Sequence, residues 1–94
     1  MRLAWTARAA ANLEEAGDYV ANDSPQAAAR LVDVIVSSVA RLQEHPYLGK
    51  AGRIPGTREL VIPRTAYVCA YRVSAGRIEI LAIRHGARDW PKHL

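Results

Sequence analysis

The sequence of 94 residues has a single cysteine, Cys69, which excludes an internal disulfide and a metal cluster held by several cysteines. No apolar run approaches the ~20 residues needed to cross a bilayer, so no membrane partner is expected. The first residues acquire Glu14, Glu15 and Asp18, which is atypical of a secretory signal. Internal repeats and low-complexity tails are also absent. These absences predict one globular domain, residues 1–94, in the cytoplasm.

Lysine is scarce, because eleven of the thirteen cationic residues are arginine, the side chain suited to a bidentate grip on carboxylate or phosphate. The net charge of +4 is unevenly placed: residues 1–47 carry −2, and residues 48–94 carry +6. A basic second half indicates an anionic partner, either nucleic acid or an acidic protein segment. The alternative is a surface charge that only keeps the protein soluble.

The first half of the chain shows helical patterns. Residues 2–6 alternate as a short strand, and Thr6 can cap a helix that begins at Ala7. Ser24 or Asp23 as a cap, with Pro25 in the first turn, predicts a second helix over residues 25–44. It ends before Pro46, because proline disfavours a helical residue before it.

The second half reads as strands. After a loop rich in glycine and proline, three β-type runs are joined by short connections that suit antiparallel neighbours. The runs span residues 58–62, 66–74 and 77–85. We therefore predict an α+β fold: a strand, a two-helix hairpin, then a three-stranded antiparallel meander.

The predicted second helix is apolar over more than one face, with Leu31 and Ile35 on its main stripe. A helix of this kind is either deeply buried or has a partner. One interpretation is that the first helix covers it. The other is that part of the hairpin, with Leu31 and Ile35 as anchors, docks another protein together with the sheet edge.

Several short motifs that could suggest a phosphate, metal or thiol site lack the pattern that such a site needs. The stretch at residues 49–56 has glycines and a lysine but lacks the P-loop spacing. His45, His85 and His93 lack the pairing of a helical zinc site, and Cys69 lies mid-strand, where a buried inert thiol is expected. We expect neither a metal nor a cofactor.

The basic residues of the predicted sheet remain as candidates for a partner surface. They are Arg58, Arg64, Arg72, Arg84, His85 and Arg88. If this set faced RNA, His85 could act as general acid or base while Arg72 and Arg84 stabilised charge on a phosphate. The strands supply no convincing second proton-transfer group beside His85, so we predict contact residues and no catalytic residues.

The last strand leads directly into a polar and aromatic segment. Gly86 lets the chain turn sharply, and Trp90 can pin the tail to the body of the protein. An aromatic residue with arginines is also typical of interface hot spots, so Trp90 is a candidate contact. The alternative is that Trp90 is a lid on the core and Arg88–Asp89 a local ion pair worth under ~1 kcal/mol.

The segment "GTRELVI…AYVCAYRV…GRIEILAIRHGARDWP" resembles the ParE branch of the RelE/ParE superfamily of bacterial type II toxins. Three upstream pieces agree with it: "W-T-x-x-A" from Trp5, "D-S-P-x-A-A" from Asp23, and "H-P-Y-L-G-K" from His45. Their order and spacing extend the likeness over nearly the whole chain.

The resemblance implies a small α+β toxin that is encoded with an antitoxin of the ParD type, whose C-terminal segment wraps and neutralises it in a toxin–antitoxin hetero-oligomer. Well-known members of this branch poison DNA gyrase and perform no chemistry, whereas RelE-like cousins cut messenger RNA on the ribosome. Gly86 follows His85 where the cutters often have an aromatic residue. This departure favours the gyrase poison and leaves the nuclease, with Arg72, Arg84 and His85, as the alternative.

Overall fold

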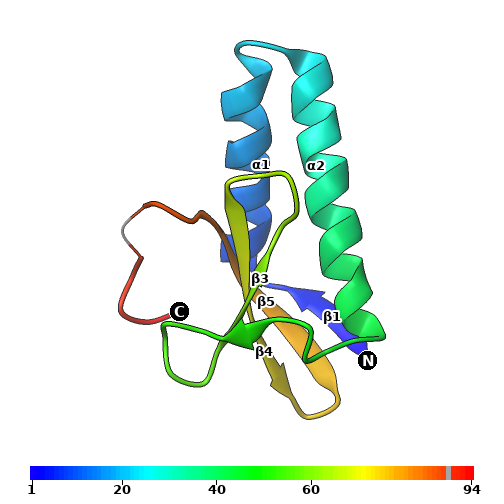
Figure 1. Ribbon diagram of the computed structural model, residues 1–94, viewed down its shortest axis with the longest axis vertical. Coiled ribbons are helices and arrows are strands. Elements are labelled where there is room, and N and C mark those ends of the chain that lie inside the picture. Colours follow the sequence, from blue (N-terminus) through cyan, green and yellow to red (C-terminus); the bar gives the residue numbers. More distant parts are fainter. Residues whose placement is uncertain (89) are drawn as a thin grey trace.

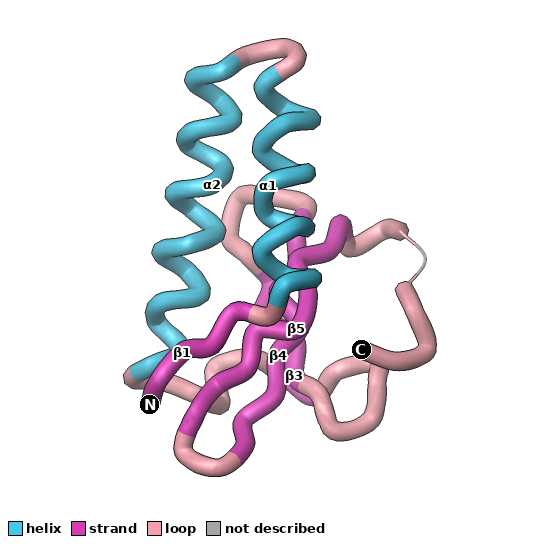
Figure 2. Tube along the Cα trace, turned by 180° about the vertical axis from the view of Figure 1, so that it is seen from behind, coloured by secondary structure: helices cyan, strands magenta, loops and turns pink. Residues whose placement is uncertain are grey.

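The computed structural model describes residues 1–88 and 90–94 and has the predicted α+β architecture. A two-helix hairpin projects beyond one end of a sheet, and the C-terminal tail returns toward the loop after β2 (Figures 1 and 2). The elements in chain order are β1 (Arg2–Trp5), α1 (Ala7–Ala21), α2 (Pro25–Ala40), a 3-10 turn (Arg41–Gln43), β2 (Lys50–Ala51), β3 (Arg58–Val61), β4 (Tyr67–Ser74) and β5 (Arg77–His85).

The sheet is larger and more mixed than the predicted meander. The five strands lie in the order β1-β5-β4-β3-β2, and β1 pairs with β5 in parallel, with Leu3 opposite Ile78. The three predicted strands form the antiparallel centre. The two-residue strand β2 was not predicted, because its pattern is too short to distinguish from the loop around it.

Both helices begin at the predicted caps. The hydroxyl of Thr6 accepts a hydrogen bond from the Ala9 amide at 3.1 Å, and that of Ser24 accepts one from the Ala27 amide at 3.1 Å. Gly17 brings the helices close, because a Cβ at this position would lie 3.2 Å from Cγ2 of Val32. None of the helices in the described part of the chain has both the length and the apolar character of a membrane span.

The core lies between the helices and one face of the central strands. Ile35 and Val39 of α2 pack with Tyr71 of β4 and Ile78 and Ile80 of β5, all fully buried. The residues that alternate with these along β4 and β5 face the other side of the sheet. There Val68 and Ala70 are buried. Ala82 is buried on the same face, because the irregularity at Ala70 and Tyr71 pairs it with Ala70, so both faces of the central strands are covered. This explains why the sequence of β5 reads as a nearly continuous apolar run.

The β4–β5 connection is a tight hairpin turn, as its length predicted. Ala75 and Gly76 both have positive φ, at 51° and 76°, as a two-residue type I′ turn requires. The strands it joins stay in register except for an irregularity at Ala70 and Tyr71. The turn therefore fixes which side chains of β4 and β5 share a face.

Candidate functional site

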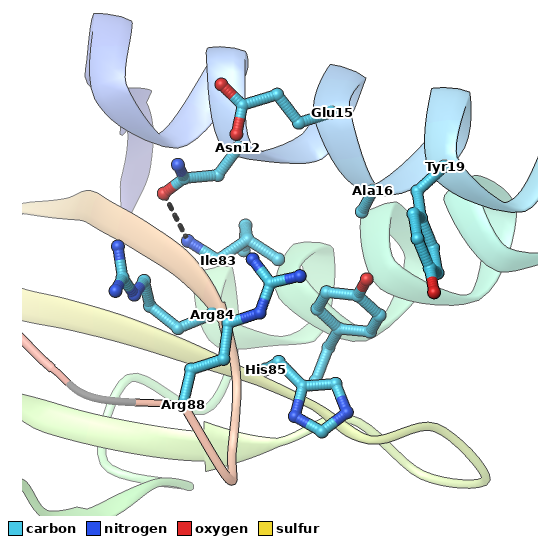
Figure 3. A pocket seen from close by; sticks show the side chains of 9 residues that line it. Asn12, Glu15, Ala16, Tyr19, Ile83, Arg84, His85 and Arg88 are labelled. Atoms are coloured by element: carbon cyan, nitrogen blue, oxygen red, sulfur yellow. Dashed lines mark hydrogen bonds between the residues drawn. The ribbon is translucent and has the colours of Figure 1, made fainter.

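Two concave surfaces lie at opposite edges of the sheet. The first, which we call the polar pocket, is a cavity of 260 Å³ between α1, the ends of β4 and β5, and the C-terminal tail (Figure 3). It is lined by Asn12, Glu15, Ala16, Tyr19, Tyr67, Ile83, Arg84, His85 and Arg88.

The polar pocket exists because β1 is shorter than β5. The strand β1 ends at Trp5, opposite Ile80, so the edge of β5 beyond Ile80 has to find other hydrogen-bond partners. Thr6 donates from its amide and its hydroxyl to the Ile80 carbonyl, at 3.0 and 2.8 Å. Further along β5, Oδ1 of Asn12 accepts a hydrogen bond from the Ile83 amide at 3.1 Å. These bonds hold α1 against β5, and the pocket opens beside them.

His85 has a defined orientation at the pocket wall. Its ring lies edge-on to Tyr67, with centroids 5.8 Å apart and planes at 75°. Nδ1 accepts a hydrogen bond from the Ala87 amide at 3.2 Å. A neutral imidazole that accepts at Nδ1 carries its proton on Nε2, so His85 presents an N–H donor on its outer side.

The second surface, the apolar groove, has a volume of 360 Å³ and lies between the end of α2 and the β3 edge. It is lined by Ser38, Arg41, Leu48, Gly49, Lys50, Glu59, Leu60, Val61 and Pro63. The strand β2 covers the outer edge of β3 only opposite Arg58 and Glu59. Within the described residues, the β3 edge therefore has no neighbouring strand at Leu60 and Val61, and Val61 is 57% exposed.

One wall of the groove is a loop that the sheet clamps in place. The buried hydroxyl of Tyr71 donates a hydrogen bond to the Pro46 carbonyl at 2.8 Å and accepts one from the Gly49 amide at 2.9 Å. Arg58 donates from Nη2 and Nε to the Gly49 carbonyl at 2.7 and 3.0 Å. A Cβ on Gly49 would lie 2.7 Å from the Glu59 carbonyl, so only glycine fits. The clamp holds Leu48, 43% exposed, at the groove.

The loop after β2 and the C-terminal tail are joined through Arg53. Its guanidinium lies 3.8 Å from the centroid of the Trp90 ring and bonds both carboxylate oxygens of Glu59, at 3.0 and 3.2 Å. Burial alone would raise the pKa of Glu59, but hydrogen bonds from the side chain and amide of Arg53, with its charge, hold that pKa below the usual value. The half-buried Trp90 is thus pinned onto the body of the protein, as its position at the chain end predicted.

The structure does not bring together the three residues of the catalytic alternative. Arg72 is opposite Glu79 in the hairpin, whereas Arg84 is opposite Val68, five residues further along β5 and about 16 Å away at the strand rise. His85 follows Arg84 and therefore projects from the other face of the sheet. Arg72 is 3.9 Å from Glu79 in a half-exposed ion pair. The catalytic alternative needs Arg72 and Arg84 around one phosphate, and the antiparallel hairpin keeps them apart.

Some of the residues predicted to contact a partner instead stabilise the fold. Ile35 is fully buried in the core and is not exposed for docking, and Leu31 is half-buried against that core. The guanidinium of Arg58 bonds its own loop. Arg64 is exposed in the β3–β4 turn, where its φ is 62°. The Arg88–Asp89 ion pair lies outside the described residues.

The structure places Cys69 in the core and the last basic candidates at the polar pocket. Cys69 is buried, and burial raises the pKa of its thiol to about 12, as expected of an inert cysteine. Arg84 is half-buried and Arg88 exposed, and both line the polar pocket with His85.

Sequence reasoning missed residues that only the tertiary structure brings to these surfaces. Asn12, Glu15 and Tyr19 share one side of α1, at helical spacing, but nothing in the sequence shows which strand they face. The pair Arg53 and Glu59 could have been suspected, since opposite charges flank a loop with Pro55 and Gly56. The apolar groove was not predicted, because its walls come from three separate segments.

Comparisons with known proteins agree with this architecture. A family model described as "ParE toxin of type II toxin-antitoxin system, parDE" matches residues 3–90. The chain is 44% identical to the putative toxin Y4kP of Sinorhizobium fredii over 99% of its own length and 96% of that protein. It is 34% identical to toxin RelE2 of Caulobacter vibrioides over 93% and 97% of the two chains.

A solved structure of the chromosomal ParDE toxin–antitoxin system from P. aeruginosa superimposes with a TM-score of 0.84. Its sequence identity to this chain is 35%, and the match covers 90% of this chain and 95% of the other. Family model, relatives and structure thus agree over nearly the whole sequence. The chain belongs to the ParE toxin family, within the RelE/ParE superfamily, and is a toxin of a type II toxin–antitoxin system.

Proposed function

We propose that this toxin acts in the cytoplasm by binding DNA gyrase without performing chemistry itself, and that a ParD-type antitoxin neutralises it. The observation that carries the proposal is the separation of Arg72 from Arg84 and His85 across the hairpin. Metal-free cleavage of RNA needs acid, base and charge-stabilising groups around one phosphate. Basic side chains separated in this way along the hairpin suit contact with a large partner better.

The ribosome-dependent endoribonuclease remains the second candidate. One observation favours it: the polar pocket places Glu15 and Tyr67 in the same lining as His85. The second proton-transfer group that the strands did not supply could come from either of these residues. Arg84 and Arg88 would then stabilise charge on the phosphate.

One purified sample separates the two functions. The toxin is incubated with gyrase and supercoiled plasmid, and in parallel with translating ribosomes. Linear DNA with intact messenger is the expected result. Messenger cut at codon positions, with the plasmid unaffected, would overturn the gyrase proposal in favour of the endoribonuclease.

For the antitoxin, the apolar groove is the docking surface that the geometry favours. Leu48, Leu60 and Val61 offer apolar anchoring points beside a β3 edge that an extended segment could extend by main-chain hydrogen bonds. Arg41 and Lys50 also line the groove. An apolar segment with acidic residues, from the C-terminal part of the antitoxin, fits this combination.

This revises the contacts expected from the sequence. Arg58 and Arg72 were among the basic residues predicted for a partner surface, but Arg58 bonds its own loop and Arg72 is paired with Glu79. We therefore assign the acidic contacts first to Arg41 and Lys50. Arg84 is at the other edge of the sheet, where a long wrapping segment would reach it last.

Binding measurements with groove variants test this assignment. Val61→Asp should weaken antitoxin binding at least about tenfold, because it places a charge in the apolar contact. Val36→Asp, on an exposed part of α2 outside the groove, is the matched control and should change affinity less than about twofold. Equal effects of the two variants, or none, would locate the antitoxin elsewhere.

A further inference from the structure

The polar pocket lies outside the groove to which antitoxin docking is assigned above, and its chemistry differs from that of the groove. We propose that it binds one phosphate group of a single-stranded nucleic acid, with the adjacent base stacked on Tyr19. The endoribonuclease candidate would share the phosphate contact, but the proposal requires neither cleavage, nor gyrase as the target, nor the groove as the antitoxin site.

The cavity is too small to enclose a whole small molecule but large enough for part of one. Pockets that enclose a whole small molecule have volumes of roughly 300–1,000 Å³, whereas this one has 260 Å³. A phosphate with part of its sugar can enter such a cavity, while the base and the flanking nucleotides stay outside. A polymer that places one unit in the pocket is therefore favoured over an enclosed metabolite.

The charges of the lining favour an anion. Arg84 approaches from β5 and Arg88 from the tail, and Glu15 is the acid of the lining. In Figure 3 the guanidinium of Arg88 points toward α1. Guanidinium groups match the geometry of phosphate oxygens, and Glu15 is exposed, so water screens its opposing charge.

Neutral donors complete the lining. Nδ1 of His85 is engaged by the Ala87 amide, so the neutral ring offers its Nε2 proton. The hydroxyl of Tyr67, whose ring contacts His85 edge-on, can also donate. Hydrogen bonds from neutral groups add to the arginine contacts without increasing repulsion among the side chains.

An exposed aromatic ring distinguishes nucleic acid from an acidic peptide. Tyr19 is 69% exposed and extends from α1 toward the strand end (Figure 3). A ring so accessible to water contributes little to the core, but it forms a platform on which a base can stack. A carboxylate of a peptide would use the arginines and leave Tyr19 without a role.

The experiment uses the purified full chain, without gyrase or antitoxin, and a short fluorescent oligothymidylate whose binding is followed by anisotropy at low salt. Tyr19→Ser should weaken binding about tenfold, since stacking on an aromatic ring commonly contributes that much. Tyr47→Ser is the matched control, because Tyr47 is 64% exposed and lies outside the pocket lining.

The charge contribution is tested in the same assay. Arg88→Gln should weaken binding and lower the salt dependence by about one counterion, whereas Arg64→Gln, an equal change of charge at an exposed turn, should weaken it less. Circular dichroism checks that the variants fold. These outcomes support the proposal.

Three results would overturn it. Equal weakening by Arg64→Gln and Arg88→Gln would mean diffuse attraction to a basic surface. Unchanged binding in Tyr19→Ser would exclude the stacking platform. Displacement of the oligonucleotide by polyglutamate of equal charge and concentration would assign the pocket to an acidic peptide. Each of these results leaves the plasmid and ribosome assays unaffected, so failure here is distinct from failure of the proposed function.

Discussion

The two edges of the sheet use arginine in different ways. At the β3 edge, Arg58 and Arg53 are held by the protein itself: one bonds the loop that forms the groove wall, and the other bonds a buried carboxylate. At the β5 edge, Arg88 is exposed beside a polar cavity. The same residue type therefore builds an apolar surface at one edge and presents charge at the other.

This difference teaches that basic composition alone does not locate a charged interface. The second half of the chain carries a net charge of +6, yet part of that charge is neutralised or fixed within the structure. Partners of different chemistry are expected at the two edges. The following variants break or sharpen that contrast.

The largest effect is expected from Gly49→Ala. The new methyl group would meet the Glu59 carbonyl at 2.7 Å and the Tyr71 ring at 2.8 Å, so the clamp must open. Overpacking of this kind costs about 1–3 kcal/mol, and antitoxin affinity should fall with it. Gly86→Ala is the control, because its Cβ would make ordinary contacts of 3.5 Å, and urea denaturation measures both. Equal stability of the two variants would contradict the clamp.

The second-largest loss of stability is expected from Glu59→Gln. Glu59 is 5% exposed and accepts three hydrogen bonds from Arg53, so loss of its charge should cost about 1–2 kcal/mol.

The same variant gives a test by pH. Since the folded pKa of Glu59 lies below its usual value, the carboxylate stabilises the fold at pH values above that usual value, and the stabilisation is lost as the pH falls through the folded pKa. Unfolding free energies of wild type and Glu59→Gln should therefore converge as the pH falls through the folded pKa of Glu59. A difference that is constant down to pH 2 would contradict an ionic role for Glu59.

Asn12→Ala tests how the polar pocket is built. The variant leaves the Ile83 amide without its side-chain acceptor, which should cost about 1 kcal/mol. Hydrogen exchange at Ile83 should accelerate, while exchange at Tyr71, in the clamped half, stays unchanged. Asn22→Ala, at the exposed end of α1, is the control. Unchanged exchange at Ile83 would show that Asn12 does not hold this edge.

The smallest effect is expected from Arg72→Gln. Its ion pair with Glu79 is long, at 3.9 Å, and the arginine side chain is 40% exposed, so stability should change by less than about 0.5 kcal/mol. Endoribonuclease activity lost in Arg72→Gln but kept in Arg64→Gln would revive the catalytic alternative. Thermal denaturation and the ribosome assay together decide this.

Local signals explain how far the sequence predicts this fold. Thr6 and Ser24 were predicted as caps, because capping depends on residues within one helical turn. The tight connection between residues 66–74 and 77–85 was predicted from its length, which is also a local signal. The parallel pairing of β1 with β5 was not, since its register depends on residues more than seventy positions apart.

The candidate site was less predictable than the fold. Arg72, Arg84 and His85 seemed to gather only while the strand direction and faces were ignored. Tyr71 packs in the core, and in addition its hydroxyl orders the loop before β2, a role that no pattern in the sequence indicates. Such roles arise from tertiary contacts between distant segments, which no local pattern encodes.

The pairing of the first strand with the last has a consequence for how the toxin is made. Leu3 cannot pair with Ile78 until the chain has been synthesised past Ile78, so a shorter nascent chain lacks β5, the strand that joins β1 to β4. Pairings this distant in sequence also form late and slowly, because a long chain must be closed to make them. The five-stranded sheet therefore cannot be completed before β5 has been made.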